Sequence, residues 1–271
     1  MPTAAWWKSF YARERAGIDL DAVLDAAPLI PFPDRGALVF PHTRLAASSS
    51  LVASVARAAA GMRQDVLAIG VLHGGREGDA PVVAQARAGD RDARTLLRGI
   101  HAEDGLAAEE FSLDGFRALY ERACRREGRT PRLTTRYPFL VGDHPEDLPN
   151  WDELARLARD HIVVGTADPM HHGIGYGTGE ALEETLAGTI AFARSRIEEH
   201  LDALERADFS GFSRLCSRDL SDFRDVGPVL AGLFPESTWT LEDLRLVNYA
   251  DVLGCAKPTW VAATQIRVRK T

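Results

Sequence analysis

Three apolar segments of the chain each run into residues that can bind a metal ion. They are residues 37–40 before His42, residues 66–72 before His73, and residues 162–164 before Asp168 and His171. Short apolar segments of this kind are typical of buried strands. The carboxyl ends of parallel strands lie along one edge of a sheet, so we expect these side chains to meet there. Two imidazoles with one carboxylate suit Fe(II) and oxygen chemistry.

Asp168 and His171 are three residues apart, so both can reach the same point from one turn. We interpret His171 as a carrier of protons, because the pKa of an imidazole lies near the working pH. Asp168 is interpreted as the group that orients His171 or holds a water. A simpler explanation stays open, since a single strand-end histidine is usually structural and Asp168 before Pro169 can form an ordinary turn. Because all three expected strands end at such residues, the pattern favours a functional site.

The segments around these strands predict alternating strands and helices. Expected strands are residues 37–40, 66–72, 136–142, 162–164, 245–249 and 259–268. Expected helices are a piece near residues 20–27, residues 46–60 and 112–126, a helix after the capping box at Asn150, residues 180–206, and a segment at 209–233 broken near Asp225. The long helix has an apolar stripe at Leu182, Leu186, Ile190, Ile197, Leu201 and Leu204. No linker or repeat divides the chain, so we expect one domain.

The composition excludes several classes of protein. The 271 residues are 45% hydrophobic and 26% charged, with a formal net charge of -7, as is typical of soluble globular chains. Interspersed charges argue against a nucleic-acid surface, and no apolar run approaches the ~20 residues that span a bilayer. The first residues lack the order of a signal peptide. Three distant cysteines, Cys124, Cys216 and Cys255, argue against a disulfide framework, so we expect a cytoplasmic protein.

Four of the remaining histidines are expected to lie outside the site. Their contexts are a predicted solvated loop for His144, helical segments for His161 and His200, and the position after His171 for His172. His101 is ambiguous, because the polar segment that it shares with Glu103 and Asp104 can border the site.

Several segments, in their order along the chain, resemble one known family. They are Ala4-Ala5-Trp6-Trp7, Val39-Phe40-Pro41-His42, Ile69-Gly70-Val71-Leu72-His73, Phe139-Leu140-Val141-Gly142, Val164-Gly165-Thr166-Ala167-Asp168-Pro169-Met170-His171-His172-Gly173 and Val247-Asn248-Tyr249-Ala250. The longest is similar to Val-Ser-Ser-Asp-Phe-Cys-His-Trp-Gly, the most specific motif of the Memo family. The chain thus resembles the Memo family, which has the fold of the class III extradiol dioxygenases, and the similarity runs across nearly the whole chain.

The resemblance implies a fold and a set of site residues. The fold is a single α/β domain over residues 1–271, with a central mixed sheet flanked by helices. His42 and His73 are implied as metal ligands, and Asp168 and His171 as residues that line the metal pocket. In the related dioxygenases, the histidine at the position of His171 serves as acid and base beside iron. The implied metal is Fe(II) first, with copper as the alternative.

The third ligand departs from the family pattern. The family has a cysteine there, and an ungapped match places Ser221 at that position. Asp222 is adjacent and would complete a set of two histidines and one carboxylate, which oxygen-activating iron prefers. Cys216, five residues earlier, would favour copper, and Ser221 could hold a water. The absence of a third ligand is the remaining alternative. The family's acidic-His-Ser segment is also absent in register near Asp104.

These observations predict a mononuclear non-haem Fe(II) oxygenase. Its partners are O2 and a small molecule that is aromatic or bears an amine. The alternative is a metal-binding or protein-interaction member of the family without turnover, and a metal-assisted hydrolase is a third possibility. The sequence carries no signal for an oligomeric state.

Overall fold

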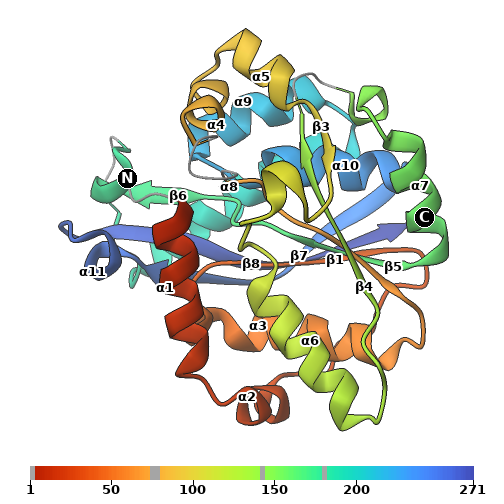
Figure 1. The fold of residues 1–271 in the computed structure, drawn as a ribbon. Helices are drawn as coiled ribbons and strands as arrows, with labels where there is room; N and C mark the ends of the chain where they lie inside the picture. The colour runs from red at the N-terminus through yellow and green to blue at the C-terminus, as the bar shows by residue number, and fades with distance from the viewer. Residues whose placement is uncertain (1–3, 74–79, 141–143, 179–181) are drawn as a thin grey trace.

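The computed structural model describes residues 4–73, 80–140, 144–178 and 182–271. These residues form a single α/β domain in which helices flank a mixed sheet of eight strands, as expected (Figure 1). The strand order is β3-β4-β2-β5-β1-β8-β6, and β7 also pairs with β8. The expected strand end at residues 141–142 and the expected helix start at residue 180 lie outside the described residues.

Parallel strands form the middle of the sheet, and antiparallel strands extend it. The parallel strands are β1 (Gly36–Phe40), β2 (Val66–Ile69), β4 (Leu133–Phe139) and β5 (Ile162–Thr166), and the antiparallel strands are β3 (Gly99–His101), β6 (His171–Gly173), β7 (Ser237–Asn248) and β8 (Thr259–Lys270). Phe40 lies opposite Thr166, and Ile69 lies opposite Gly165. The strands β1, β5 and β2 therefore end side by side, and the segments that follow them emerge at one edge.

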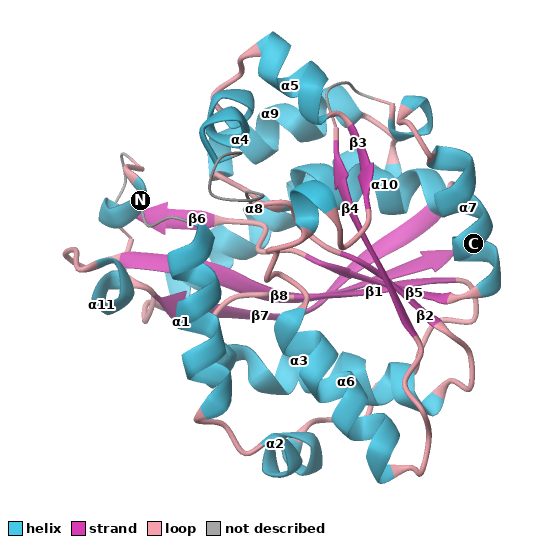
Figure 2. Ribbon diagram, viewed as in Figure 1, coloured by secondary structure: helices cyan, strands magenta, loops and turns pink. Residues whose placement is uncertain are grey.

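Helices cover both faces of the sheet (Figure 2). On one side lie α1 (Ala4–Ala16), α2 (Leu20–Ala26), α3 (Leu45–Gly61) and α6 (Asp114–Arg126), and on the other α7 (Trp151–Asp160), α8 (Ala187–Glu205), α9 (Phe209–Asp219) and α10 (Phe223–Leu233). Shorter helices are α4 (Ala80–Arg87), α5 (Arg91–Leu97) and α11 (Ala250–Leu253), with 3-10 turns at Gly105–Ala107, Pro145–Asp147 and Ile174–Tyr176. In the described part of the chain, none of these helices is both long and apolar enough to cross a membrane.

The central strand β1 contributes side chains to two hydrophobic cores. Ala37 and Val39 pack in the core that includes residues of α8 and α10, whereas Leu38 and Phe40 pack in the core of α3 and α6. This division follows from the strand geometry, since successive side chains point to opposite faces. All five residues of β1 are buried, as expected for a parallel strand covered on both faces.

The elements differ from the sequence expectation in several places. Helix α1 was not expected, and β7 begins eight residues before the expected strand at residue 245. Helix α8 begins only at Ala187, and Leu186 and Ile190 of the expected buried stripe are 55% and 42% exposed. The helical segment after it breaks at Leu220, earlier than expected, because Leu220 adopts a left-handed conformation that ends α9.

Candidate metal centre

His42 follows β1 and is held by the end of the neighbouring strand. Its Nδ1 lies 3.3 Å from Thr166 Oγ1, and that hydroxyl donates its own proton to the Phe40 carbonyl at 2.9 Å. The Thr166 oxygen can therefore only accept from His42, so Nδ1 carries the proton. The lone pair of His42 Nε2 then faces away from the sheet edge and toward the other candidate residues.

His73 follows β2 and is held by Glu110, a residue that the sequence analysis did not single out. The buried Glu110 carboxylate accepts hydrogen bonds from His73 Nδ1 at 2.9 Å and from the His73 backbone N–H at 2.6 Å. It also accepts from the N–H groups of Phe111 and Ser112, at 2.8 and 3.2 Å. A carboxylate accepts only, so Nδ1 donates, and Nε2 is the atom that can offer a lone pair to a cation once it has lost its own proton. The sequence feature that could have pointed to Glu110 is its position in a polar segment, directly before the apolar Phe111.

His171 begins β6 and is held by a backbone carbonyl. Its Nδ1 lies 2.7 Å from the oxygen of Leu220, which accepts the proton of Nδ1. Leu220 has a φ of 51°, a left-handed conformation that is costly for leucine and is found where a special backbone direction is needed. The group that orients His171 through Nδ1 is therefore the Leu220 carbonyl and not Asp168, whereas the alternative role of Asp168, holding a water, stays a prediction. Tyr176 lies edge-on to the ring, with centroids 4.9 Å apart.

The Nε2 atoms of the three histidines all lie close to one carboxylate oxygen, that of Asp222. His42 Nε2 and His73 Nε2 are 3.1 Å apart, and both lie close to Asp222 Oδ2, at 3.4 and 3.5 Å. His171 Nε2 lies 3.6 Å from the same oxygen. Each Nδ1 proton is already committed, so the facing Nε2 lone pairs repel unless a cation or an added proton lies between them.

Asp222 reaches this place from the turn between α9 and α10. Its backbone N–H donates to the Asp168 carbonyl at 3.1 Å, which ties the turn to the end of β5. Burial alone would raise the pKa of Asp222, but the surrounding histidines lower it well below the usual range. The group is thus a carboxylate, and together with His42 and His73 it forms a set of side chains able to hold a metal ion.

The other two candidates for the third ligand have different surroundings. The Ser221 hydroxyl accepts a hydrogen bond from the Phe223 N–H at 3.1 Å, at the start of α10. Cys216 is buried in the hydrophobic core of α9, and burial raises the pKa of its thiol. Among the described residues, the groupings able to hold a metal include neither of them. All three cysteines are free.

Asp168 is the most deeply buried carboxylate of the cluster, with 2% of its surface exposed. Its Oδ2 lies 3.7 Å from His42 Nε2, and within the described residues its Oδ1 has no hydrogen-bond partner. Burial raises the pKa of Asp168, although His42 and His171 oppose that shift. A buried carboxylate oxygen without a partner is rare in folded proteins and indicates a missing cation, proton or ligand.

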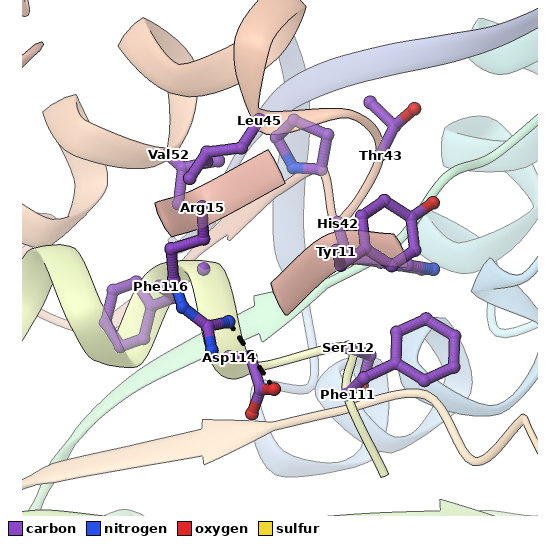
Figure 3. A pocket seen from close by; sticks show the side chains of 12 residues that line it. Tyr11, Arg15, His42, Thr43, Leu45, Val52, Phe111, Ser112, Asp114 and Phe116 are labelled. Atoms are coloured by element: carbon purple, nitrogen blue, oxygen red, sulfur yellow. Dashed lines mark ion pairs between the residues drawn. The ribbon is translucent and has the colours of Figure 1, made fainter. Parts of the chain in front are cut away.

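Side chains from α1 and from the segment before α6 form a hollow beside His42 (Figure 3). The rings of Tyr11 and Phe111 stack with centroids 5.3 Å apart, and Phe111 in turn stacks on His73 at 4.5 Å. The Tyr11 hydroxyl lies 2.8 Å from the Tyr249 hydroxyl, which also contacts Thr43 Oγ1 at 2.6 Å. Aromatic rings therefore form a continuous wall on one side of the cluster.

The remaining histidines have local structural contacts. His172 stacks on Trp260, with ring centroids 4.7 Å apart, and accepts a hydrogen bond from the Leu182 N–H. The ring nitrogens of His101 and His161 bond to carbonyl groups four residues earlier, those of Leu97 and Leu157. His144 is exposed, and His200 is buried against Asp219. The expectation that His144, His161, His172 and His200 lie outside the site agrees with these contacts, and His101, for which the sequence left both possibilities open, bonds within its own segment.

No protein-family model matches the chain, and no curated protein matches it by sequence. The resemblance to the Memo family therefore stays a prediction that rests on the motifs quoted above. The assignment of the cluster rests on its own geometry, to which the turn Asp168–His171 contributes two of five side chains.

Proposed function

We propose that this protein is a mononuclear non-haem iron enzyme of the oxygenase type, with His42, His73 and Asp222 as ligands of the iron. The observation that carries the proposal is the shared direction of three imidazoles. Each Nδ1 is held by an acceptor outside the cluster, so each Nε2 offers a lone pair to a common centre. Fixing the tautomer of a ligand histidine in this way is the usual arrangement at protein metal sites.

The donor set supports Fe(II) over copper. Two neutral imidazoles and a carboxylate are borderline to hard ligands, and the two-histidine-one-carboxylate set leaves positions for O2 and substrate. Copper(I) would favour a thiolate, whereas the thiol of Cys216 lies in the hydrophobic core. The Asp168 Oδ1 atom, which has no hydrogen-bond partner among the described residues, supports a cation in the cluster, because a positive charge nearby would compensate this buried carboxylate.

Iron would supply oxygen binding and polarisation of the substrate. The chain itself would supply the movement of protons, and His171 Nε2 is the atom suited to it, since Nδ1 is fixed by Leu220. Tyr11 and Phe111, which line the hollow beside His42, would give an apolar wall for part of a small substrate. We therefore infer a small aromatic or amine-bearing substrate.

The test is reconstitution with Fe(II) under anaerobic conditions, followed by metal analysis and measurement of O2 consumption. We expect about one tightly bound iron per chain and substrate-dependent O2 uptake that His42→Ala abolishes. His144→Ala is the matched control, because it removes an exposed histidine outside the cluster. Protein that takes up no iron would overturn the proposal. Iron binding without O2 uptake would favour a non-catalytic metal-binding protein, and anaerobic cleavage of an ester or amide would favour a hydrolase.

A further inference from the structure

The cluster contains more ligands than one iron site needs. His42, His73 and Asp222 form one group able to hold a cation, and Asp168, His171 and Asp222 form a second. Within each group, the candidate ligand atoms all lie within 4.8 Å of one another. Asp222 belongs to both groups, so two cations could share its carboxylate. The second group is the subject of this inference.

Asp168 supplies an independent reason to place a cation in the second group. It is 2% exposed, and its Oδ1 has no hydrogen-bond partner among the described residues. Its Oδ2 lies 3.7 Å from His42 Nε2, and a carboxylate oxygen of Asp168 lies within 4.8 Å of the candidate ligand atoms of His171 and Asp222. One cation on His42, His73 and Asp222 would leave this buried oxygen without a direct partner. A second cation between Asp168 and His171 would compensate the buried Asp168 carboxylate directly.

The two positions should differ in their affinity for a cation. The first offers two imidazoles and a carboxylate, and His73 donates two hydrogen bonds to Glu110, whose carboxylate accepts two more from the amides of Phe111 and Ser112. The second offers one imidazole and two carboxylates, one of them shared with the first ion. Two ions that share a carboxylate lie about 3.5–4 Å apart and repel each other. The second ion should therefore bind more weakly than the first.

We propose that a second divalent cation binds to Asp168, His171 and Asp222 at higher metal concentration and inhibits the protein. This inference rests on the proposed function, because it assumes that the first position is filled and that His171 moves protons. The second ion would occupy the lone pair of His171 Nε2, while Nδ1 stays bound to the Leu220 carbonyl. An imidazole in that state can neither accept nor donate a proton, so excess metal would switch the site off.

The proposal predicts two steps in a titration with Mn(II), followed by equilibrium dialysis and metal analysis. We expect the second dissociation constant to exceed the first by at least about tenfold. At two ions per chain, electron paramagnetic resonance should show exchange coupling between the ions, because they share Asp222. Asp168→Asn and His171→Ala should each remove the second step and the coupling while the first step persists. His144→Ala should retain both steps.

The outcomes separate the inference from the proposed function. A single step in the natural protein, unaffected by Asp168→Asn, would overturn the second position and leave the proposed function intact. Two steps that persist in both Asp168→Asn and His171→Ala, without exchange coupling, would show adventitious binding elsewhere and would also overturn it. Absence of both steps would overturn the proposed function together with the inference. With Fe(II), loss of O2 uptake between one and two ions per chain would support inhibition, and unchanged uptake would contradict it.

Discussion

The candidate metal centre and the junction of α8 with α9 both bury histidine against carboxylate, but they arrange the groups differently. At the junction, His200 Nε2 lies 3.0 Å from Asp219 Oδ2. Arg218 contacts the same carboxylate through two of its nitrogens, at 3.0 and 2.6 Å, and Arg196 lies 3.7 Å away. Although burial opposes it, the hydrogen bonds from His200 and Arg218 lower the pKa of Asp219. This carboxylate is neutralised within the protein itself.

In the candidate metal centre, the histidines bind their partners through the opposite ring nitrogen. The imidazoles use Nδ1 to bind Thr166, Glu110 and the Leu220 carbonyl, and so their Nε2 atoms converge. At the junction, His200 uses Nε2 for its carboxylate, and within the described residues its Nδ1 has no partner. The comparison shows that burial of histidine beside aspartate does not identify a metal site. The two regions differ in the direction of the free ring nitrogen and in the source of the charge that compensates the carboxylate.

Removal of a ligand should give the largest difference in metal affinity between variants of the two regions. We expect His73→Ala and Asp222→Ala to weaken metal binding by at least about 100-fold, because each deletes one of three ligands. His200→Ala should leave metal affinity unchanged, although it creates a cavity beside Phe212. Isothermal titration with Mn(II) or anaerobic Fe(II) measures this difference. Equal losses in all three variants would mean that the comparison is wrong.

Glu110→Gln should weaken metal binding by about 10- to 100-fold without removing a ligand. The amide keeps an oxygen acceptor but loses the charge that fixes the His73 tautomer. Glu109→Gln is the matched control, since Glu109 is the exposed neighbour. The dissociation constants of the two variants and their thermal unfolding are to be compared. A Glu110→Gln protein that is folded and binds metal normally would show that metal binding does not need the charged hydrogen-bond partner of His73.

The pH dependence of metal binding should reflect His73. Burial lowers its pKa, but Glu110 and Asp222 outweigh that effect and raise it to about 9 in the metal-free protein. Below that pH the imidazole holds a proton that the metal must displace, so affinity should rise with pH by at most about tenfold per unit up to about pH 9. In Glu110→Gln the rise should end at lower pH. Proton release, measured in buffers of different ionisation enthalpy, checks the sign.

Asp219→Asn should have the smallest effect on metal affinity and a clear effect on stability. The change removes the charge that Arg218 and His200 share, and we expect the free energy of unfolding to fall by about 1.5 kcal/mol. Metal affinity should stay the same, because Asp219 serves the packing of α8 on α9. Urea unfolding and a metal titration of the same sample test both parts. A weaker metal site in a stably folded Asp219→Asn variant would contradict the separation.

The sequence by itself determined the strand ends and therefore most of the cluster. Buried parallel strands need apolar residues on both faces, so polar residues placed just after them were recognisable as edge residues. This reasoning predicted His42, His73, Asp168 and His171 at one edge, and the structure brings them together. Asp222 was one of three alternatives, because one residue more or less in a turn changes which side chain reaches a given point.

The tertiary structure decided how these residues are held. Glu110, Thr166 and the Leu220 carbonyl come from segments 37, 124 and 49 residues distant from the histidines that they orient. No local periodicity encodes such contacts, because they depend on which loops the fold places beside the sheet edge. The choice of Asp222 over Ser221 and Cys216 has the same origin. The left-handed turn at Leu220 and the bond from the Asp222 N–H to Asp168 direct the carboxylate toward the histidines.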